Sequence, residues 1–426
     1  MTIGILVFIA CLVIGIPIAF CLGIASIAML YVNGISLIVI AQRMFTGIDS
    51  FPFMAIPFFV LAGDLMNRSG ITKKLVDFSD LFVGHIRGDL SHINIVVSMF
   101  FAGITGSAVA DTSAIGSMLI PAMVERGYDL DYSAAVTASS SVIGPIIPPS
   151  IPMVIFSLLS GQSVAALFIG GLLPGILLGL SLLVVSIYIS AKRNYPKRDY
   201  KITMKHFINV SLNALVPLMM PLIILGGILS GVFTATEASC IAVVYSLIVS
   251  FIVYRSLTIK ELCNSFIETA KTTGIVFLVI ACSNIFNWLL SIEQVPQLMA
   301  SIFKEHVSTQ FMFLLVLNLL LLFLGTFMEG TAALIITVPI FLPIAISYGV
   351  NPVMFGIIVV LNLMIGLITP PVGLCLYVAC GIAKISLERM TKAIIPFFIA
   401  EVVTLFIVTY WPPLTLWLPR LLGYVR

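Results

Sequence analysis

The chain has 426 residues, of which 60% are hydrophobic and only 9% are charged, whereas an average soluble protein is about 45 to 50% apolar and about 25% charged. So few charged side chains cannot cover the surface of a water-soluble protein of this size, but a surface in contact with lipid needs no such cover. The same composition, with a net charge of +3, excludes a disordered chain and a nucleic-acid-binding protein. The sequence therefore predicts an all-α polytopic membrane protein.

Apolar stretches long enough to cross about 30 Å of hydrocarbon recur along the chain. Nine of them predict one crossing each: residues 3–34, 51–66, 132–160, 163–190, 209–229, 233–254, 274–291, 351–383 and 393–411. The first has no basic segment before it and no small-residue cleavage site, so we expect a retained span rather than a signal peptide. Two further stretches, 93–122 and 310–348, are polar in the middle, which is typical of hairpins that enter the membrane and turn back.

Basic residues predict the orientation of these spans. The segment 192–205 contains six basic residues and one acid, namely Lys192, Arg193, Lys197, Arg198, Lys201 and Lys205 against Asp199. By the positive-inside rule this loop is cytoplasmic. Counting spans back from it predicts a cytoplasmic N-terminus if residues 3–34 form one span, and the opposite side if they form two. The count makes one further loop cytoplasmic although it is net acidic, the loop with Glu125, Arg126, Asp129 and Asp131.

The sequence also contains an internal repeat. Residues 144–149 read Gly-Pro-Ile-Ile-Pro-Pro, and residues 366–371 read Gly-Leu-Ile-Thr-Pro-Pro, 222 positions later. A second set of matches lies upstream, where Gly106, Ser107 and Thr112 correspond to Gly325, Thr326 and Thr331. An amphipathic stretch precedes each hairpin, at 75–86 and at 295–303, so the matched elements extend beyond one motif.

Five predicted spans separate the two hairpins, so the second copy has inverted topology relative to the first. Many secondary transporters are built in this way, with the binding site between broken helices near the midplane. We therefore expect a first repeat at 1–190, a cytoplasmic loop and connecting span at 191–229, and a second repeat at 230–426.

The paired prolines predict that one helix of each repeat is broken. Pro148 and Pro149 in the first copy, and Pro370 and Pro371 in the second, remove backbone donors and prevent regular helix. The carbonyl groups that this frees need partners in hydrocarbon. A hard cation with oxygen ligands is one possibility, and a proline kink satisfied by neighbouring hydroxyl groups is the other. Two matched breaks opposite two polar hairpins favour the cation.

Each hairpin turn combines glycine, small hydroxyl residues and one acid: Thr105, Ser107, Asp111, Thr112 and Ser113 in the first, and Thr326, Glu329 and Thr331 in the second. Amide groups at a helix start favour an anion such as a substrate carboxylate. An acid at the bilayer centre costs about 2.5 to 3.5 kcal/mol, so we interpret Asp111 and Glu329 as ion ligands, with helix capping as the alternative. Glu237 and Glu401 lie in predicted spans but in no repeated motif, so an inter-helix hydrogen bond or a wet cleft is a sufficient explanation for them.

Other functional classes fit less well. The sequence has no H-E-x-x-H, G-x-S-x-G or G-x-G-D motif, so an intramembrane protease is not indicated, and it has no phosphate-binding loop for an ATP-driven pump. A channel is the stronger rival because broken half-helices also line pores. Two inverted copies in one chain favour a transporter with alternating access.

These motifs, in this order and spacing, resemble the large membrane subunit of tripartite ATP-independent periplasmic (TRAP) transporters, the M subunit or DctM-like permease, over nearly the whole chain. The resemblance implies two inverted repeats, each with a re-entrant hairpin and a broken helix, that form an elevator-type scaffold and transport domain. It implies a multi-pass protein of the bacterial inner membrane that imports an organic acid, of the C4-dicarboxylate or sialic acid type, with sodium. A stand-alone sodium- or proton-coupled symporter of the divalent-anion type is the alternative.

The resemblance also implies site residues and partners. By comparison with the divalent-anion/sodium symporters, one sodium site contains Ser107, Asp111, Thr112 and Gly144, and a second contains Thr326, Glu329, Gly330, Thr331, Gly366 and Thr369. Those symporters have asparagine where Asp111 and Gly330 stand. The expected substrate-binding residues are Ser107, Ser113, Pro148, Thr326 and Glu329. The expected partners are a small four-helix membrane subunit (Q type) on a separate chain, a periplasmic substrate-binding protein (P type) and membrane lipid.

Overall fold

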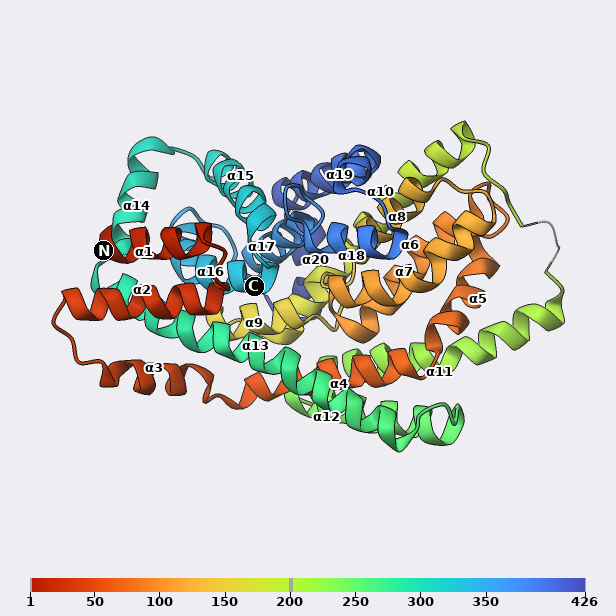
Figure 1. Ribbon diagram of the computed structural model, residues 1–426, viewed down its shortest axis with the longest axis horizontal. Coiled ribbons are helices and arrows are strands. Elements are labelled where there is room, and N and C mark those ends of the chain that lie inside the picture. Colours follow the sequence, from red (N-terminus) through yellow and green to blue (C-terminus); the bar gives the residue numbers. More distant parts are fainter. Residues whose placement is uncertain (1, 199–201, 426) are drawn as a thin grey trace.

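The computed structural model describes residues 2–198 and 202–425, and in this part of the chain every regular element is a helix (Figure 1). The first part contains α1 (Thr2–Val13), α2 (Ile18–Val32), α3 (Ile38–Ile48), the 3-10 helix η1 (Phe51–Met54), α4 (Ala55–Arg68), α5 (Ile71–Val83), α6 (Asp89–Thr105), α7 (Ala108–Glu125), α8 (Leu130–Ser141), α9 (Ile151–Ser160) and α10 (Val164–Lys192). The prediction of an all-α fold is confirmed.

The second part begins after the basic loop and is again entirely helical. It contains α11 (Met204–Leu229), α12 (Ala235–Ile248), the π-helix η2 (Val249–Val253), α13 (Ile259–Ile292), α14 (Val295–His306), α15 (Gln310–Phe327), α16 (Gly330–Ser347), α17 (Pro352–Gly366), α18 (Leu374–Ala383), α19 (Leu387–Tyr410) and α20 (Pro413–Leu421).

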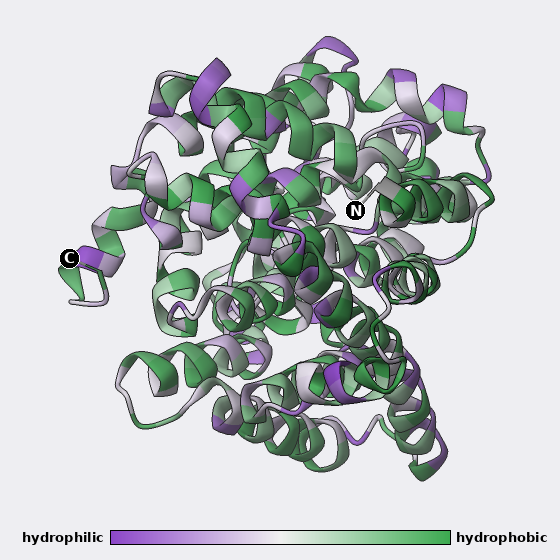
Figure 2. Ribbon diagram, turned by 90° about the vertical axis from the view of Figure 1, so that its left-hand side faces the viewer, coloured by the Kyte–Doolittle hydropathy of each residue, from purple (hydrophilic) through white to green (hydrophobic). Residues whose placement is uncertain are grey.

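Seven of the described helices are long and apolar enough to cross a membrane, or eight if α3 and α4, which meet at a 67° bend, count as one broken span. Figure 2 shows hydrophobic residues along most of the helical ribbon and hydrophilic residues in short segments. Many large apolar side chains are exposed on the outer helices, among them Leu6, Leu180, Val184, Leu212, Leu222, Ile275 and Phe323. Such a surface is suited to lipid.

The first apolar stretch is not the single span that its hydropathy predicts. Gly15 has a positive φ of 86° and Pro17 precedes α2, so residues 3–34 form two short helices. These pack against each other, and Gly4 near the start of α1 lies against Met29 near the end of α2. The two helices are therefore antiparallel, and the beginning of α1 lies at the same end of the molecule as Asn33, which donates a hydrogen bond to Glu293 next to α14 (2.9 Å).

This hairpin changes the predicted orientation of the N-terminus. In Figure 1 the beginning of α1 and α14 lie at the left-hand end, while α11 begins at the right-hand end. The described N-terminal residues are thus at the end opposite the basic loop, contrary to the expectation that both lie on the cytoplasmic side. Because residues 3–34 form two helices instead of one span, the predicted side of the N-terminus is reversed, and the predicted sides of the later loops are unchanged.

The charged loops that were expected to share one side of the membrane do meet at one end. Arg193 of the basic loop pairs with Asp129 (2.6 Å), and Arg389 in the first turn of the last long span, α19, pairs with Asp131 (3.5 Å). A hydrogen bond from the Tyr195 hydroxyl, followed by the contact with Arg193, holds the pKa of Asp129 below its usual value. The acidic loop therefore complements the basic one rather than contradicting it. Asp199 and Lys201 lie outside the described residues.

The two predicted repeats have the same sequence of elements in the structure. The hairpin α6–α7 is followed by the pair α8 and α9, and the hairpin α15–α16 is followed by the pair α17 and α18. Both helices of each hairpin pack against the first helix of the following pair. The predicted helix breaks at the two proline motifs are thus confirmed, as are the amphipathic helices α5 and α14 that precede the hairpins.

The second helix of each pair crosses to the other repeat. Helix α9 packs against α16 and α17, and α18 packs against α7 and α8. Because each hairpin is contacted by a half-helix from the opposite repeat, the two halves of the chain interlock around their polar turns.

Candidate functional site

The turn of the first hairpin lies against the break between α8 and α9. Gly106 ends α6 with a φ of 62°, and a Cβ atom at this position would be 2.7 Å from the carbonyl oxygen of Pro149. Ser107 begins the next helix, where its hydroxyl group accepts a hydrogen bond from the amide of Ala110 (3.5 Å). Glycine is required here both by the left-handed backbone and by the close approach to the break.

Asp111 is the buried acid of this turn. Its side chain has no exposed surface, and one carboxylate oxygen accepts a hydrogen bond from the hydroxyl group of Thr105. The other oxygen has no hydrogen-bond partner among the described residues. It lies against Gly144 in the break, where any Cβ atom would overlap it. Because Ser107 is the N-cap of α7, capping does not explain Asp111, and that alternative is wrong.

The other residues predicted around this turn differ in position. Thr112 is buried, and its hydroxyl group donates to the carbonyl oxygen of Ala108 (2.8 Å). Pro148 is buried in the break and joined to Pro149 by a cis peptide bond. Ser113 is exposed. The structure therefore brings Ser107, Asp111 and Gly144 together at one turn and places Ser113 on the outer face of α7.

The turn of the second hairpin lies against the break between α17 and α18 in the same way. A Cβ atom at Gly366 would be 2.5 Å from the Cα atom of Gly325, so the two backbones are in direct contact. The hydroxyl group of Thr326 donates to the carbonyl oxygen of Phe323 (2.7 Å), and that of Thr369 donates to the carbonyl oxygen of Ile365 (2.9 Å). Gly330 lies against Met364 of α17.

Glu329 differs from Asp111 in exposure and in its partners. It is exposed and is the N-cap of α16, where one carboxylate oxygen accepts from the amide of Ala332 (2.9 Å). The other oxygen accepts from the hydroxyl group of Thr331 (2.7 Å). The capping alternative for Glu329 is therefore confirmed as a structural role. The two predicted sites are unequal, because the first has a free buried oxygen and the second has none.

Buried amide side chains fix each hairpin to its broken helix. In the first repeat, Asn94 of α6 donates to Thr137 of α8 (2.7 Å). In the second, Asn362 of α17 donates to the side chain of Asn318 of α15 (2.9 Å). Buried hydrogen bonds of this kind hold the hairpins in position with defined geometry. These pairs could not be predicted from the sequence, because their members are more than 40 residues apart in the chain.

The structure also shows where two further acids, Glu237 and Glu401, and one buried cysteine lie. Glu237 is exposed and forms a capping box with Thr234 at the start of α12, so it is not inside the membrane protein's core. Glu401 is fully buried and has no hydrogen-bond partner in the described part of the chain. Cys375 is buried in the first turn of α18, the half-helix that packs against α7. Its place beside the first hairpin could not be assigned from spacing alone, whereas Thr105 is one of the polar residues that the sequence already places at that turn.

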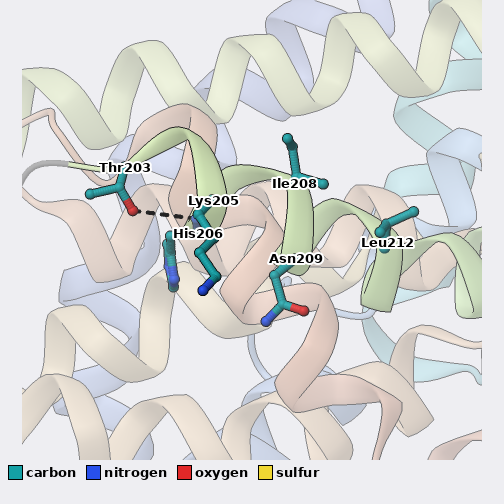
Figure 3. A pocket seen from close by; sticks show the side chains of 6 residues that line it. All are labelled: Thr203, Lys205, His206, Ile208, Asn209 and Leu212. Carbon is teal, nitrogen blue, oxygen red and sulfur yellow. Dashed lines mark hydrogen bonds between the residues drawn. The ribbon is translucent and has the colours of Figure 1, made fainter.

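A surface hollow of about 780 Å³ lies elsewhere, at the beginning of α11. Figure 3 shows the six residues that line it: Thr203, Lys205, His206, Ile208, Asn209 and Leu212. All six are exposed, and the hydroxyl group of Thr203 accepts a hydrogen bond from the amide of His206 as the helix cap (3.3 Å). The hollow contains no residue of either hairpin turn.

The chain matches a family model described as "Tripartite ATP-independent periplasmic transporter, DctM component" over residues 5–414. It is 40% identical to the sialic acid TRAP transporter large permease protein SiaM of Vibrio cholerae, over 96% of each protein. It is 41% identical to the C4-dicarboxylate TRAP transporter large permease protein DctM of Pseudomonas aeruginosa, over 90% of each. It is also 42% identical to the isethionate TRAP transporter permease protein DctMQ of Oleidesulfovibrio alaskensis, over 94% of this chain and 63% of that protein.

Among solved structures, the YdaH transporter of Alcanivorax borkumensis is similar, with a TM-score of 0.66 and 12% sequence identity over 88% of each chain. This likeness shows that the fold is that of a membrane transporter. The match over nearly the whole length, the apolar helices and the two hairpins lead to one assignment. The chain belongs to the DctM family of TRAP transporter large permeases, and it is a multi-pass protein of the bacterial inner membrane rather than an enzyme.

Proposed function

We propose that this chain imports an organic anion by using the sodium gradient, with the anion delivered by a separate periplasmic binding protein. The observation that carries the proposal is the free oxygen of Asp111, which is buried at the turn of the first hairpin and lies against the main chain of Gly144. A buried carboxylate without a partner is costly. A cation bound between this oxygen and the carbonyl groups of the break compensates for that cost.

Sodium suits this position because hard cations take oxygen ligands. In a continuous helix, the backbone carbonyl groups between α8 and α9 would accept hydrogen bonds from amide groups of that helix. The break makes carbonyl groups available to a cation, and Ser107 and Thr105 add hydroxyl groups at the adjacent hairpin turn. We place the second sodium at the matching turn, near Thr326, Gly330, Gly366 and Thr369. There Glu329 is exposed and serves as a helix cap, so we expect that site to bind more weakly.

An anionic substrate suits the starts of α7 and α16. Each of these helices begins at a hairpin turn, so its first amide groups point out of the helix and its dipole favours negative charge. Ser107 and Thr326 lie at these two turns. The substrates named for the three relatives, sialic acid, C4-dicarboxylate and isethionate, are all organic anions. We therefore propose an organic acid as the substrate class.

The proposed partners are a small membrane subunit and a periplasmic binding protein. The family description names a tripartite transporter with this chain type as one component. The chain covers 63% of the relative DctMQ, so that protein has a further segment that this chain does not match. We propose that a separate small subunit of the Q type corresponds to it, and that lipid surrounds both.

We further propose that the hairpins and broken helices move together against a scaffold. Part of the packing agrees with this division, because a small hydrophobic cluster of α2 and α13, with side chains such as Leu22, Met29, Phe286 and Leu289, is separate from the large cluster that contains both hairpins and both broken pairs. The large cluster also includes residues of α4, α10, α11 and α12. A rigid unit that carries its ions and substrate past a separate scaffold is the motion of an elevator.

The proposed sodium coupling is tested by thermal unfolding of the purified chain in the chlorides of sodium, lithium, potassium and choline at equal ionic strength. A bound ion stabilises the folded protein by RT ln(1 + [L]/Kd), which is about 2.7 kcal/mol at 100 times Kd. We expect a rise in melting temperature that is selective for sodium and absent in Asp111→Asn. Four identical melting curves would refute sodium coupling. Uptake of organic acids into vesicles, with the binding protein present, then identifies the substrate.

A further inference from the structure

Glu401 is a second buried acid of the membrane interior, and the proposed function does not use it. It lies near the middle of α19, its side chain has no exposed surface, and neither carboxylate oxygen has a hydrogen-bond partner among the described residues. An ionised carboxylate in such surroundings is strongly disfavoured, because nothing replaces its lost hydration. The carboxylate of Glu401 therefore needs a bound cation, either a metal ion or a proton, that compensates for its negative charge.

A proton fits this position better than a metal ion does. Hard metal cations need several oxygen ligands, and in the part of the chain that the structure describes no polar group lies within hydrogen-bond distance of either Glu401 oxygen. A proton needs only one oxygen and removes the charge. The absence of surrounding ligands therefore selects protonation of the carboxyl group over metal binding.

The helices packed against α19 provide few other titratable groups near Glu401. These helices are α8, α10, α17 and α18. Helix α17 has no titratable residue, and the acid of α8, Asp131, is at its first turn beside Arg389. The buried Tyr132 of α8 contacts Phe397 of α19, and its hydroxyl group shares a hydrogen bond with that of Ser186 (3.0 Å). On α10, Tyr188 is exposed and Lys192 is at the last turn, and on α18, Tyr377 is exposed. Helix α18 also carries two buried thiols, those of Cys375 and Cys380.

Helix α18, which carries the buried Cys375 in its first turn, connects the helix of Glu401 to the first ion site. Helix α18 packs against α7, which carries Asp111, and against α19, which carries Glu401. The two acids therefore lie on helices that share α18 as a neighbour, in an apolar medium that screens charge weakly.

We propose that Glu401 is a proton-binding site that is linked to the cation site at Asp111. A cation at Asp111 is held more tightly when Glu401 is ionised and less tightly when Glu401 carries a proton. By reciprocity, cation binding at Asp111 promotes release of the proton from Glu401. The proton site rests on the geometry of Glu401 alone, whereas the linkage rests also on the proposed function of Asp111.

The proton itself is tested by infrared spectroscopy of the full-length protein at about pH 7. A protonated carboxyl group has a carbonyl stretching band that an ionised carboxylate lacks. We expect the difference spectrum between wild type and Glu401→Gln to contain this band, because Gln mimics the neutral acid in shape. The matched control is Glu388→Gln on the same helix, an exposed acid paired with Lys392, which should leave the band unchanged. If Glu401→Gln removes no such band, the proton site is refuted.

A variant that keeps the carboxyl group protects this test against a folding defect. Glu401→Asp retains a titratable group at the same position but changes its surroundings, so we expect the band to shift rather than disappear. A spectrum identical to that of wild type would contradict the assignment of the band to position 401. Melting curves of each variant show whether it is folded.

The linkage is tested by measuring the sodium concentration needed for half-maximal stabilisation at about pH 6 and about pH 8. We expect wild type to bind sodium on the order of tenfold more tightly at the higher pH, which is a typical coupling between two sites. Glu401→Gln should lose this pH dependence and Glu388→Gln should keep it. Equal pH dependence in wild type and Glu401→Gln would overturn the linkage. If wild type shows no sodium-selective stabilisation at either pH, the proposed sodium site and the linkage both fail, and the infrared band still decides the proton site.

Discussion

One carboxylate oxygen of Asp111 lies directly against Gly144, a residue of the next helix break, and it has no hydrogen-bond partner among the described residues. A hairpin and a broken helix thus meet at a single free oxygen. Asp111→Asn should remove the sodium-selective rise in melting temperature while leaving the hydrogen bond from Thr105 available. Melting curves in sodium and potassium chloride measure this. A sodium response of wild-type size in Asp111→Asn would exclude the carboxylate as an ion ligand.

The substitution Gly144→Ala should also disturb the site at Asp111, because Gly144 is the residue of the helix break that lies against the free carboxylate oxygen. A Cβ atom at this position would overlap the free oxygen of Asp111, and overpacking of this kind typically costs about 1 to 3 kcal/mol. We expect a lower melting temperature and a weaker sodium response. The control is Gly381→Ala in α18, where a Cβ atom meets nothing within 4 Å and where alanine should be neutral or slightly stabilising. Equal effects of the two substitutions would show that the contact is unimportant.

Glu329→Ser separates the capping role of this residue from a role in ion binding. Serine is itself a favourable N-cap, so the variant should keep the stability of α16 and lose only the negative charge. Glu329→Ala should instead lower stability by about 1 kcal/mol, because the cap that accepts from the amide of Ala332 is removed. Unfolding free energies and sodium titrations of both variants are compared. A wild-type sodium titration in Glu329→Ser would leave capping as the residue's whole role.

Chemical labelling tests the orientation of the charged loops. Cysteines introduced at Glu125 and Lys197, both exposed, should be protected together from an impermeant reagent applied outside the cell, since Asp129 and Arg193 join their loops. A cysteine at Glu305, exposed in α14 near the opposite end, should be labelled. The background is Cys263→Ser, because Cys263 is an exposed native cysteine. Opposite labelling of positions 125 and 197 would contradict the shared end seen in the structure.

Acid pH should weaken the same junction. The pKa of Asp129 is lowered mainly by the hydrogen bond from Tyr195 and further by Arg193, so its ionised form contributes stability above the ordinary Asp pKa of about 3.9. This contribution disappears as the pH falls through the lower pKa of the folded state. Asp129→Asn should therefore reduce the melting temperature at neutral pH, and its difference from wild type should shrink in strong acid. A constant difference at all pH values would exclude titration of Asp129.

Some features of the fold were predictable because they depend on local sequence. Proline pairs break a helix wherever they stand, so the interruptions before α9 and α18 follow from Pro149 and Pro371. Hydropathy could not separate α1 from α2, because the residues around Gly15 and Pro17 are apolar on both sides. The same limitation hid α3, which is short and ends at a bend before η1.

The candidate site was predictable only in part, since its partners come from distant elements. Polar residues in an apolar hairpin identified Asp111, but its contact with Gly144 and the neighbouring thiol of Cys375 depend on tertiary packing. Glu401 received little weight because it belongs to no repeat, yet burial rather than repetition makes it unusual. Exposure likewise separates Glu329 from Asp111, although the sequence interpretation made both acids ion ligands.

The crossing of α9 and α18 between the two repeats has a consequence for the origin of the chain. A half-length ancestor with one hairpin and one broken helix would have lacked the half-helix that now packs against its hairpin. Such a protein would have covered that face of its hairpin only by exchanging half-helices with a second copy of itself. Gene fusion would then have preserved an exchanged dimer within one polypeptide, and it would also have allowed the two hairpin turns to diverge, so that the first has the buried Asp111 where the second has Gly330.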